Sequence, residues 1–399
     1  MNSHDPTTLP DDYGSESQRL DSPFGSRQLL RYPLPAPGQG REQSLRAWDA
    51  ADEYLLRWLH EQGAGNNTAT LVLNDQFGAL TCTLPCRPLW SQSDSWLAQH
   101  ACQLNLQQLP AGAAAAAPVL LDSLHWPSQP LRLVVVRLPK QLALLEHQLY
   151  CLRPLLSATT RVVAAGMVKH WPPSAQQLFT DILGPSHTSL AWKKARLLHC
   201  TPDPASWQGA SPYPDHYRLQ QPPLQLSNHA NLFSRSGLDI GTRFFLPHLP
   251  QPAGETEVID LGCGNGVLGL ALLQANPNLR LHFVDESHMA VASARDNLQS
   301  NLPAVHTAQW HVDDGLRSFA DNSVDLVVNN PPFHQQAVVG DHLARQMFRD
   351  AHRVLRRHGE LWIVGNRHLG YHLRLQRLFG NCDTVASNRK FVILRARKV

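Results

Sequence analysis

The sequence has little of what marks secreted, membrane-spanning or zinc-binding proteins. Its seven cysteines are scattered and include no Cys-x-x-Cys pair, which argues against a disulfide framework and against a zinc site. No window approaches the roughly 18 consecutive apolar residues that a transmembrane helix needs. The first residues, MNSHDPTTLPDDYGSE, lack the basic and apolar regions of a signal peptide. We therefore expect a cytoplasmic protein with no membrane segment and no bound metal.

Charged residues are also few, at 17% of the chain against 43% hydrophobic residues, and the formal net charge is +3. This charge is unevenly distributed. Nine Lys and Arg but only two Asp and Glu lie between residues 131 and 200, a local balance of 9 − 2 = +7. Such a bias is usual for a solvated protein face, and it also suits a surface that binds nucleic-acid phosphates.

The 399 residues are enough for two domains. Residues 1–40 are rich in Pro, Ser, Gly and Asp without periodicity, so we expect a disordered tail. A first domain is expected over 41–200, a proline-rich linker over 201–223 and a second domain over 224–399. The first helix is expected over 45–59, where apolar residues have helical spacing.

Apolar segments typical of β-strands alternate with helical patterns in both domains, which predicts the parallel sheets of an α/β fold. In the second domain the last two strands are expected to form an antiparallel hairpin, which closes a seven-stranded sheet. The strands are expected at 70–73, 131–136 and 161–165 in the first domain, and at 257–261, 281–285, 308–312, 324–328, 360–364, 382–386 and 390–394 in the second.

Three pairs of similar segments about 190 residues apart predict a duplication, in which one architecture is encoded twice. LVVVRLPK at 133–140 resembles LVVNNPPF at 326–333, and LGPSHTSLAWKKARLL at 183–198 resembles FGNCDTVASNRKFVIL at 379–394. TLVLNDQFGAL falls where EVIDLGCGNGVLGL stands in the second half.

A glycine-rich loop, Asp260-Leu-Gly-Cys-Gly-Asn-Gly266, follows a predicted strand and precedes a helical segment. Glycines there let backbone N–H groups approach a ligand at the carboxyl edge of a parallel sheet. Asp285 ends the next predicted strand, where a carboxylate can accept hydrogen bonds from ribose hydroxyls. Because 264–269 also matches Gly-x-Gly-x-x-Gly, these features suit a dinucleotide as well as another ligand that contains a ribose.

The segment NNPPFH at 329–334 ends the apolar strand predicted at 324–328, because proline cannot donate to a sheet ladder. Asn330-Pro331-Pro332-Phe333 resembles the (Asn/Asp)-Pro-Pro-(Tyr/Phe) signature of methyltransferases that act on planar amino nitrogens. The exocyclic amine of a planar base is a poor nucleophile, since its lone pair is delocalised. The side-chain oxygen of Asn330 and the carbonyl of Pro331 could accept its hydrogens, with Pro332 stiffening the turn. Phe333 could stack on the base.

With these motifs in this order, the sequence resembles the class I S-adenosylmethionine-dependent methyltransferases. The resemblance implies a Rossmann-like fold for the second half. Together with the duplication, it predicts two tandem Rossmann-like domains, each a mostly parallel seven-stranded sheet flanked by helices, with the N-terminal one degenerate. It implies S-adenosyl-L-methionine as cofactor and catalysis by Asn330, Pro331, Pro332 and Phe333. The cofactor-binding residues it implies are Asp260, Gly262, Cys263, Gly264, Asn265, Gly266, Asp285, Glu286, Asp313, Asp314, Phe233 and Asp239.

Further segments, at 228–243, 330–335 and 365–368, are similar to the bacterial ribosomal RNA guanine-N2 methyltransferases. The segments 47–56, 73–78 and 190–197 resemble the members that act on the large subunit. This implies methylation of guanine 1835 of 23S rRNA, as naked RNA or in an assembling large subunit. The sequence does not give the oligomeric state, and we expect a monomer. A small-subunit rRNA methyltransferase, a release-factor glutamine methyltransferase and a non-catalytic RNA-binding assembly factor stay open as alternatives.

The first half has lost these motifs. Asn74-Asp-Gln-Phe-Gly78 replaces the glycine loop, and Arg137-Leu-Pro-Lys140 replaces Asn-Pro-Pro-Phe. We therefore predict that the first domain binds no cofactor and presents a basic face to RNA, although a scaffold with solvated charges is the alternative. The residues predicted to contact RNA are Arg137, Lys140, Lys193, Lys194 and Arg196.

Overall fold

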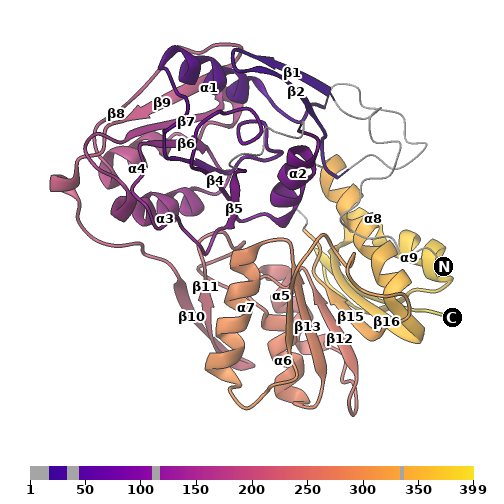
Figure 1. Cartoon of the computed structure of the whole chain (residues 1–399). Coiled ribbons are helices and arrows are strands. Elements are labelled where there is room, and N and C mark those ends of the chain that lie inside the picture. Colours follow the sequence, from indigo (N-terminus) through magenta and orange to yellow (C-terminus); the bar gives the residue numbers. More distant parts are fainter. Residues whose placement is uncertain (1–17, 34–44, 110–116, 333–336) are drawn as a thin grey trace. The chain divides into compact units, whose positions relative to one another are not determined.

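The computed structural model describes residues 18–33, 45–109, 117–332 and 337–399. The chain divides into two compact units, Met1–Pro212 and Tyr213–Val399 (Figure 1). Within the described ranges, no helix is both long and apolar enough to cross a membrane.

The first unit contains a seven-stranded sheet whose β3, β4, β5, β6 and β7 are parallel, while β9 runs antiparallel to β7 and β8. The sheet has a hydrophobic cluster on each face. Helices α1 and α2 pack in one of these clusters, and α3 and α4 pack in the other. The strand order is β5(Val119–Asp122), β4(Leu89–Ser93), β3(Thr70–Leu73), β6(Leu133–Arg137), β7(Arg161–Met167), β9(Ala195–Cys200), β8(Ser186–Thr188), and the helices are α1(Ala50–Glu61), α2(Trp96–Gln107), α3(Leu142–Leu152), α4(Ala175–Ile182).

The second unit repeats this sheet. The hairpin of β10(Asp215–Gln220) and β11(Pro223–Asn228) shares one face of the sheet with α5, α6 and α7, and α8 and α9 cover the other. The strand order is β14(Gln309–Val312), β13(Arg280–Asp285), β12(Glu257–Leu261), β15(Val324–Asn329), β16(Leu355–Asn366), β18(Phe391–Arg397), β17(Asp383–Ser387), and the helices are α5(Ile240–Phe245), α6(Val267–Ala275), α7(His288–Asn301), α8(Ala337–Val354), α9(Tyr371–Phe379).

The two sheets have the same strand order, with β12 in the place of β3 and β15 in the place of β6. This confirms the predicted fold class of two tandem, mostly parallel seven-stranded sheets. The antiparallel pairing of β17 with β18 is also as predicted. In both units the central strand and its neighbour end at one edge, where loops connect to helices, so chemistry-bearing residues are concentrated there.

The expectation of a disordered tail over 1–40 is wrong for part of its length. Strands β1(Gln18–Ser22) and β2(Gly25–Leu29) form an antiparallel hairpin. Leu20 and Leu29 are each 1% exposed and belong to the core of the first unit, so the hairpin buries enough apolar surface to be ordered. Residues 1–17 and 34–44 lie outside the described residues.

Two other boundaries differ from prediction. The expected linker 201–223 includes β10, whose Leu219 packs with the core of the second unit. Helix α1 begins at Ala50, later than expected, because Asp49 caps it: the Asp49 carboxylate accepts from the Ala51 N–H, and the Asp52 side chain accepts from the Asp49 N–H.

Candidate active site at the carboxyl edge of the second sheet

The glycine loop joins β12 to α6 through backbone conformations that L-residues rarely adopt. Gly262, Gly264 and Gly266 have φ of +67°, +54° and +79°. A Cβ added at Gly266 would lie 2.8 Å from the Ala294 Cβ, so this glycine is needed for packing against α7. A Cβ added at Gly264 would meet nothing within 4 Å, so there is open space beside the loop at this position.

Asp285, at the end of β13, lies beside this loop. One oxygen of its carboxylate accepts from the Gly264 N–H at 3.0 Å and the other accepts from the Ser287 N–H at 3.1 Å. These bonds fix the orientation of the carboxylate, and β13 is the neighbour of β12 in the sheet. Glu286 follows as an exposed residue. The geometry suits the hydroxyl-accepting role expected of an acidic strand end.

Asp260 is fully buried under the loop, where its Oδ2 accepts from the Gly269 N–H at 2.9 Å. Its Oδ1 is buried and has no hydrogen-bond partner in the described part of the chain. Burial raises the pKa of Asp260 to about 7, although the Gly269 bond opposes the shift. A buried carboxylate oxygen without a donor is costly, so the site suits a cationic or hydrogen-bonding group of a ligand.

Asn330, directly after β15, is held by the N-terminus of α5. Its Nδ2 donates to Asp239 Oδ2 at 3.1 Å and to Thr242 Oγ1 at 2.7 Å. Asp239 is the N-cap of α5, and its Oδ2 also accepts from the Thr242 N–H at 3.0 Å. Because a carboxylate can only accept, the amide must turn its NH₂ toward Asp239. The Asn330 Oδ1 therefore points elsewhere, and it is buried without a partner among the described residues.

Asp313 and Asp314 follow β14, as predicted, and are nearly buried. The Asp313 carboxylate accepts from the backbone N–H groups of Asp314 and Ser318. Asp314 accepts from the Gln346 side chain at 3.2 Å. These contacts fix the loop after β14, so Asp313 has a structural role besides the cofactor contact predicted for it.

The remaining predicted residues differ in their surroundings. The Asn265 side chain donates to the Tyr217 hydroxyl and to Asn228, which ties the glycine loop to the hairpin. Burial raises the pKa of the Cys263 thiol well above its usual range, so it stays protonated. Phe233 is 62% exposed. Pro331 is buried and Pro332 partly buried, whereas Phe333 lies outside the described residues.

No sequence motif marks Thr242 in advance, although it shares a site with Asn330. Thr242 lies three residues after the N-cap Asp239, which is the usual place for a second capping contact. This spacing is the signal in the sequence that could have pointed to Thr242. The contact with Asn330 joins residues 88 apart in the chain and becomes visible only when α5 is placed against the strand end.

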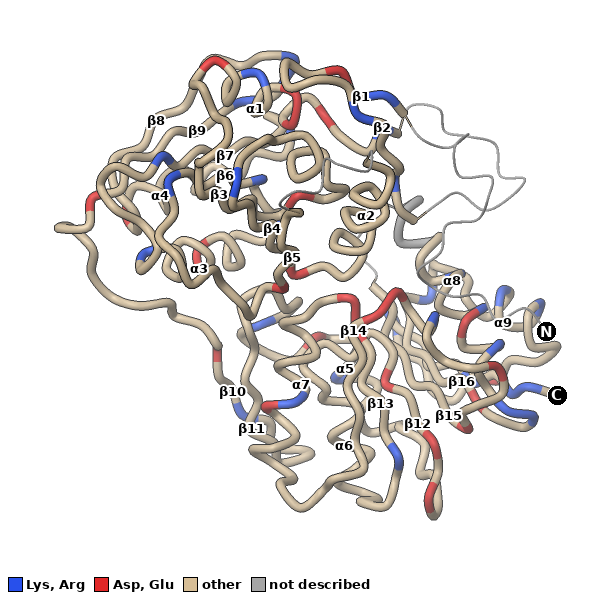
Figure 2. The backbone as a smooth tube through the Cα atoms, viewed as in Figure 1, with Lys and Arg blue, Asp and Glu red and all other residues tan. Residues whose placement is uncertain are grey.

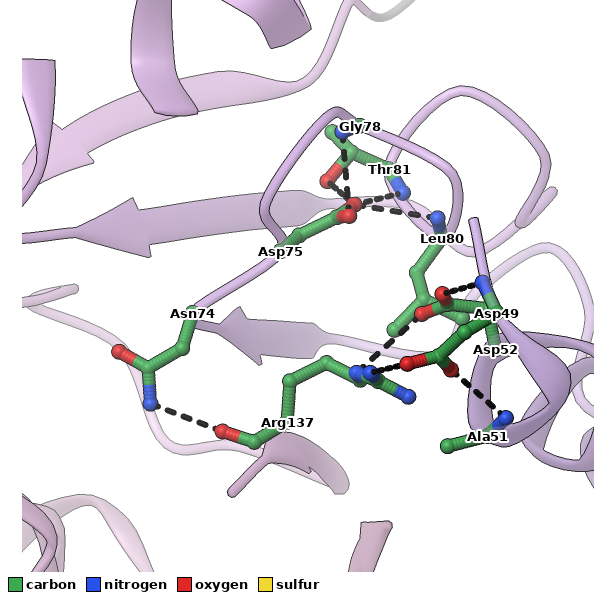
Figure 3. A network of polar contacts seen from close by, with 9 residues as sticks. All are labelled: Asp49, Ala51, Asp52, Asn74, Asp75, Gly78, Leu80, Thr81 and Arg137. Carbon is green, nitrogen blue, oxygen red and sulfur yellow. Dashed lines mark hydrogen bonds and ion pairs between the residues drawn. The ribbon is translucent and has the colours of Figure 1, made fainter. Parts of the chain in front are cut away.

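In the first unit the loop that replaces the glycine loop is closed on itself (Figure 3). The carboxylate of Asp75 accepts from the backbone N–H groups of Gly78, Leu80 and Thr81 and from the Thr81 hydroxyl, at 2.7–3.1 Å. Backbone donors that could face a ligand are therefore used internally.

Arg137 occupies the position at the end of β6 that Asn330 has after β15, and it contacts the N-terminus of α1 (Figure 3). Its Nη2 donates to Asp49 Oδ2 at 2.8 Å, and its Nε lies 3.3 Å from Asp52 Oδ1. Burial raises the pKa of Asp52 to about 7, against the attraction of Arg137. The prediction that Arg137 contacts RNA is therefore not supported, because its charge is paired inside the unit. The adjoining cavity measures about 100 Å³, well below the roughly 300–1,000 Å³ of typical small-molecule sites.

Of the other predicted RNA contacts, Arg196 lies in β9, Lys140 lies between β6 and α3, and Lys193 and Lys194 lie between β8 and β9. Figure 2 colours the Lys and Arg residues of the chain blue. Lys193 pairs with Glu53 at 2.7 Å and lies over the Trp192 ring. Lys140 and Lys194 are exposed, and within the described residues they form no ion pair. Arg196 is partly buried and its Nε is buried without a partner among those residues. Across the same described ranges, no group of three or more His, Cys, Asp or Glu is placed to hold a metal ion.

The second sheet, its glycine loop, the acidic end of β13 and the Asn-Pro-Pro end of β15 define a class I S-adenosylmethionine-dependent methyltransferase, with the first unit as a degenerate copy of the fold. Family profiles described as RLMG N-terminal domain and methyltransferase small domain match residues 17–204 and 223–395. The chain belongs to the ribosomal RNA large subunit methyltransferase G family.

Two relatives illustrate the similarity. The ribosomal RNA large subunit methyltransferase G of Stutzerimonas stutzeri (strain A1501) is 51% identical over 383 residues, 95% of this chain and 99% of the relative. That of Streptomyces avermitilis is 47% identical over 384 residues, again 95% and 99%. Among solved structures, the 16S rRNA N2 methyltransferase of T. thermophilus, in complex with AdoMet and guanosine, matches with a TM-score of 0.70 at 20% identity. The match covers 98% of this chain and 100% of that one, and it shows the shared fold.

Proposed function

We propose that the chain transfers a methyl group from S-adenosyl-L-methionine to the exocyclic N2 of a guanine in 23S rRNA, giving N2-methylguanosine and S-adenosylhomocysteine. The relatives are named as large-subunit rRNA methyltransferases. The T. thermophilus enzyme of the same fold is described as an N2 methyltransferase and was solved with guanosine. Guanine 1835 is the target implied by the sequence resemblance.

Three features fit S-adenosyl-L-methionine. The backbone at Gly264 is open, the Asp285 carboxylate is fixed beside it, and the buried Asp260 Oδ1 lacks a donor that the methionine ammonium could provide. When bound, the cofactor supplies a methyl group on a sulfonium, which is already activated for transfer. Asp313, Asp314, Glu286 and Phe233 remain our candidates for its adenosine.

The single observation that carries the proposal is the oriented amide of Asn330. Asp239 and Thr242 take up both hydrogens of its NH₂ group, so its oxygen is preset as an acceptor at the edge of the sheet. A preset acceptor next to a proline turn suits a planar amine, because accepting its hydrogens turns the nitrogen lone pair out of conjugation.

Catalysis in this proposal rests on positioning. The oxygens of Asn330 and Pro331 hold the two N–H groups of the amine, and Phe333 stacks on the base. The amine nitrogen held by these two oxygens would receive the methyl group that the cofactor supplies, and one amine proton would then pass to solvent. No strong general base is needed, since the amine loses its proton after it has been methylated. The first unit, through Lys140 and Lys194, would hold adjacent RNA.

The test incubates the full-length protein with radiolabelled S-adenosylmethionine and, separately, naked 23S rRNA, large subunits, small subunits and release factor. Nucleoside analysis of the product should find N2-methylguanosine in 23S rRNA. Methylation of a protein amide, of 16S rRNA alone or of another base would overturn the proposal. Asn330→Ala should reduce turnover at least about 100-fold while cofactor affinity changes little, whereas retained turnover would remove Asn330 from the mechanism.

A further inference from the structure

A second amide lies buried at the same edge of the sheet. Asn366 is the last residue of β16, the strand next to β15, and is 7% exposed. Its Oδ1 is buried and has no hydrogen-bond partner in the described part of the chain. Buried polar atoms are nearly always satisfied in native proteins, so an orphaned oxygen beside an active site calls for a ligand or another explanation.

Asn366 shares a sheet face with Asn330. It pairs directly with Phe391 of β18, and residues opposite each other in antiparallel strands project to the same face. Phe391 packs in the hydrophobic cluster that contains Phe245 of α5, and its ring lies 6.5 Å from that of Phe244. Asn330 bonds to the N-terminal residues of the same helix. Both amides therefore lie on the side of the sheet that α5 covers.

The register also places the two amides close together along the edge. Asn329 pairs with Ile363 in the parallel β15 and β16, so Asn330 is level with the residue after Ile363 and Asn366 stands two residues further on. With a rise of about 3.3 Å per residue and strands about 4.8 Å apart, the two Cα atoms are separated by about 8 Å. One planar base can reach two side-chain oxygens at this spacing.

The arrangement of donors on the bases makes a second acceptor selective. In guanine the N2 amine is flanked by the N1–H group, so two donors stand side by side on one edge. In adenine and cytosine the ring nitrogen beside the amine on that edge is an acceptor, which would face another acceptor. A pair of acceptor oxygens therefore favours guanine among bases that carry an exocyclic amine.

We propose that the Asn366 side-chain oxygen accepts a hydrogen bond from N1–H of the target base and so selects guanine. This inference rests on the proposed function, because it assigns the second donor of the base whose N2 is placed at Asn330. Asn366 is thus a specificity-determining residue. An enzyme that lacks it still has the acceptors for the amine but no partner for N1–H.

The test compares two substrates that both carry the amine. A synthetic RNA with the mapped target guanine is ligated into full-length 23S rRNA, and a second preparation has 2-aminopurine there, which keeps the amine but has no N1–H. Wild-type enzyme should prefer guanine over 2-aminopurine by about 10- to 100-fold in kcat/KM. Asn366→Leu, which is close in size and has no acceptor, should lose most of this preference by losing activity on guanine.

Asn366→Asp keeps an acceptor and should keep the preference for guanine. If the leucine variant is insoluble, Asn366→Ala provides the same comparison. The inference would be overturned if Asn366→Leu kept the wild-type preference for guanine. It would also be overturned if this variant lost kcat/KM equally on both substrates. Failure of the proposed function is seen separately, because wild-type enzyme would then form no N2-methylguanosine in the guanine-containing RNA.

Discussion

Asn330 and Arg137 occupy equivalent positions in two copies of one fold, and each contacts the first turn of a helix. The contacts correspond residue by residue: Asp239 and Asp49 are N-caps, and Thr242 and Asp52 lie three residues later. With an amide, the contact leaves one oxygen available for a substrate. With a guanidinium, it becomes a closed ion pair. At this position, an amide therefore leaves an acceptor for a substrate, whereas a guanidinium leaves none.

If this network presets the amide, then Thr242→Val should impair the reaction through Asn330. Valine has the shape of threonine but cannot accept from the Asn330 NH₂, so Asp239 alone is left to orient the amide. We expect kcat to fall about 10-fold, with little change in cofactor affinity. Asp239→Ser, which keeps an N-cap but has a shorter side chain, should give a similar loss.

Measurement of the same substitutions in an Asn330→Ala background separates positioning from general damage. In that background Thr242→Val and Asp239→Ser should lower kcat little further, because the Asn330 amide that they position is gone. Additive losses in that background would mean that α5 supports the site in another way, and they would exclude the positioning role for Thr242.

At the scale of elements, strand positions were predictable because parallel strands buried on both faces read as continuous apolar segments. The prediction at 70–73 coincides with β3, and that at 161–165 lies within β7. The hairpins β1–β2 and β10–β11 were missed, because each has a largely polar sequence and is ordered by a few leucines that reach a core built from distant residues.

The sequence predicted those parts of the candidate site that lie directly after a strand. The glycine loop and the Asn-Pro-Pro turn are local motifs, and both lie at the carboxyl ends of the strands to which the sequence assigned them. The orientation of Asn330 was not predictable, because it depends on α5, a helix of six residues packed against the end of β15. Asn366 was equally hidden, since only strand register shows which face it shares.

The glycine loop provides a prediction with a matched control. Gly264 and Gly254 have φ of +54° and +64°, and a Cβ added at either meets nothing within 4 Å. Alanine at each position should therefore cost a similar amount of stability, about 1 kcal/mol, for the left-handed backbone. Only Gly264→Ala should weaken cofactor binding, by at least about 10-fold, because its methyl group projects over the open side of the loop.

Isothermal titration with S-adenosylmethionine and thermal unfolding of both variants test this expectation. Equal affinities would show that the ligand does not approach the backbone at Gly264. A loss of affinity in Gly254→Ala as well would mean that strain alone disturbs the site. Gly266→Ala is unsuitable as a probe, since its methyl group would clash with Ala294 and force a shift of the loop or of α7.

At the scale of the whole molecule, part of the basic charge between residues 131 and 200 is structural. Arg137 is paired with two carboxylates, and Arg153 is 9% exposed and donates to the carbonyls of Ile182, Gln208 and Gly209. The local balance of +7 therefore overstates the charge available to a partner. Lys194 remains among the exposed cations, at the tip of the turn between Trp192 and Ala195.

Lys194 allows the RNA role of the first unit to be tested in the intact chain. It has φ of +63°, so Lys194→Gly removes a charge and relieves a strained backbone, and stability should stay within about 1 kcal/mol of wild type. Asn67→Gly is the control, because Asn67 has φ of +68° and is also exposed but carries no charge. If Lys194 contacts a phosphate, its loss should reduce by about 1 the slope of log affinity for 23S rRNA against log salt concentration. Asn67→Gly should leave the slope unchanged, and an unchanged slope in Lys194→Gly would assign this lysine to the solvated surface of a scaffold.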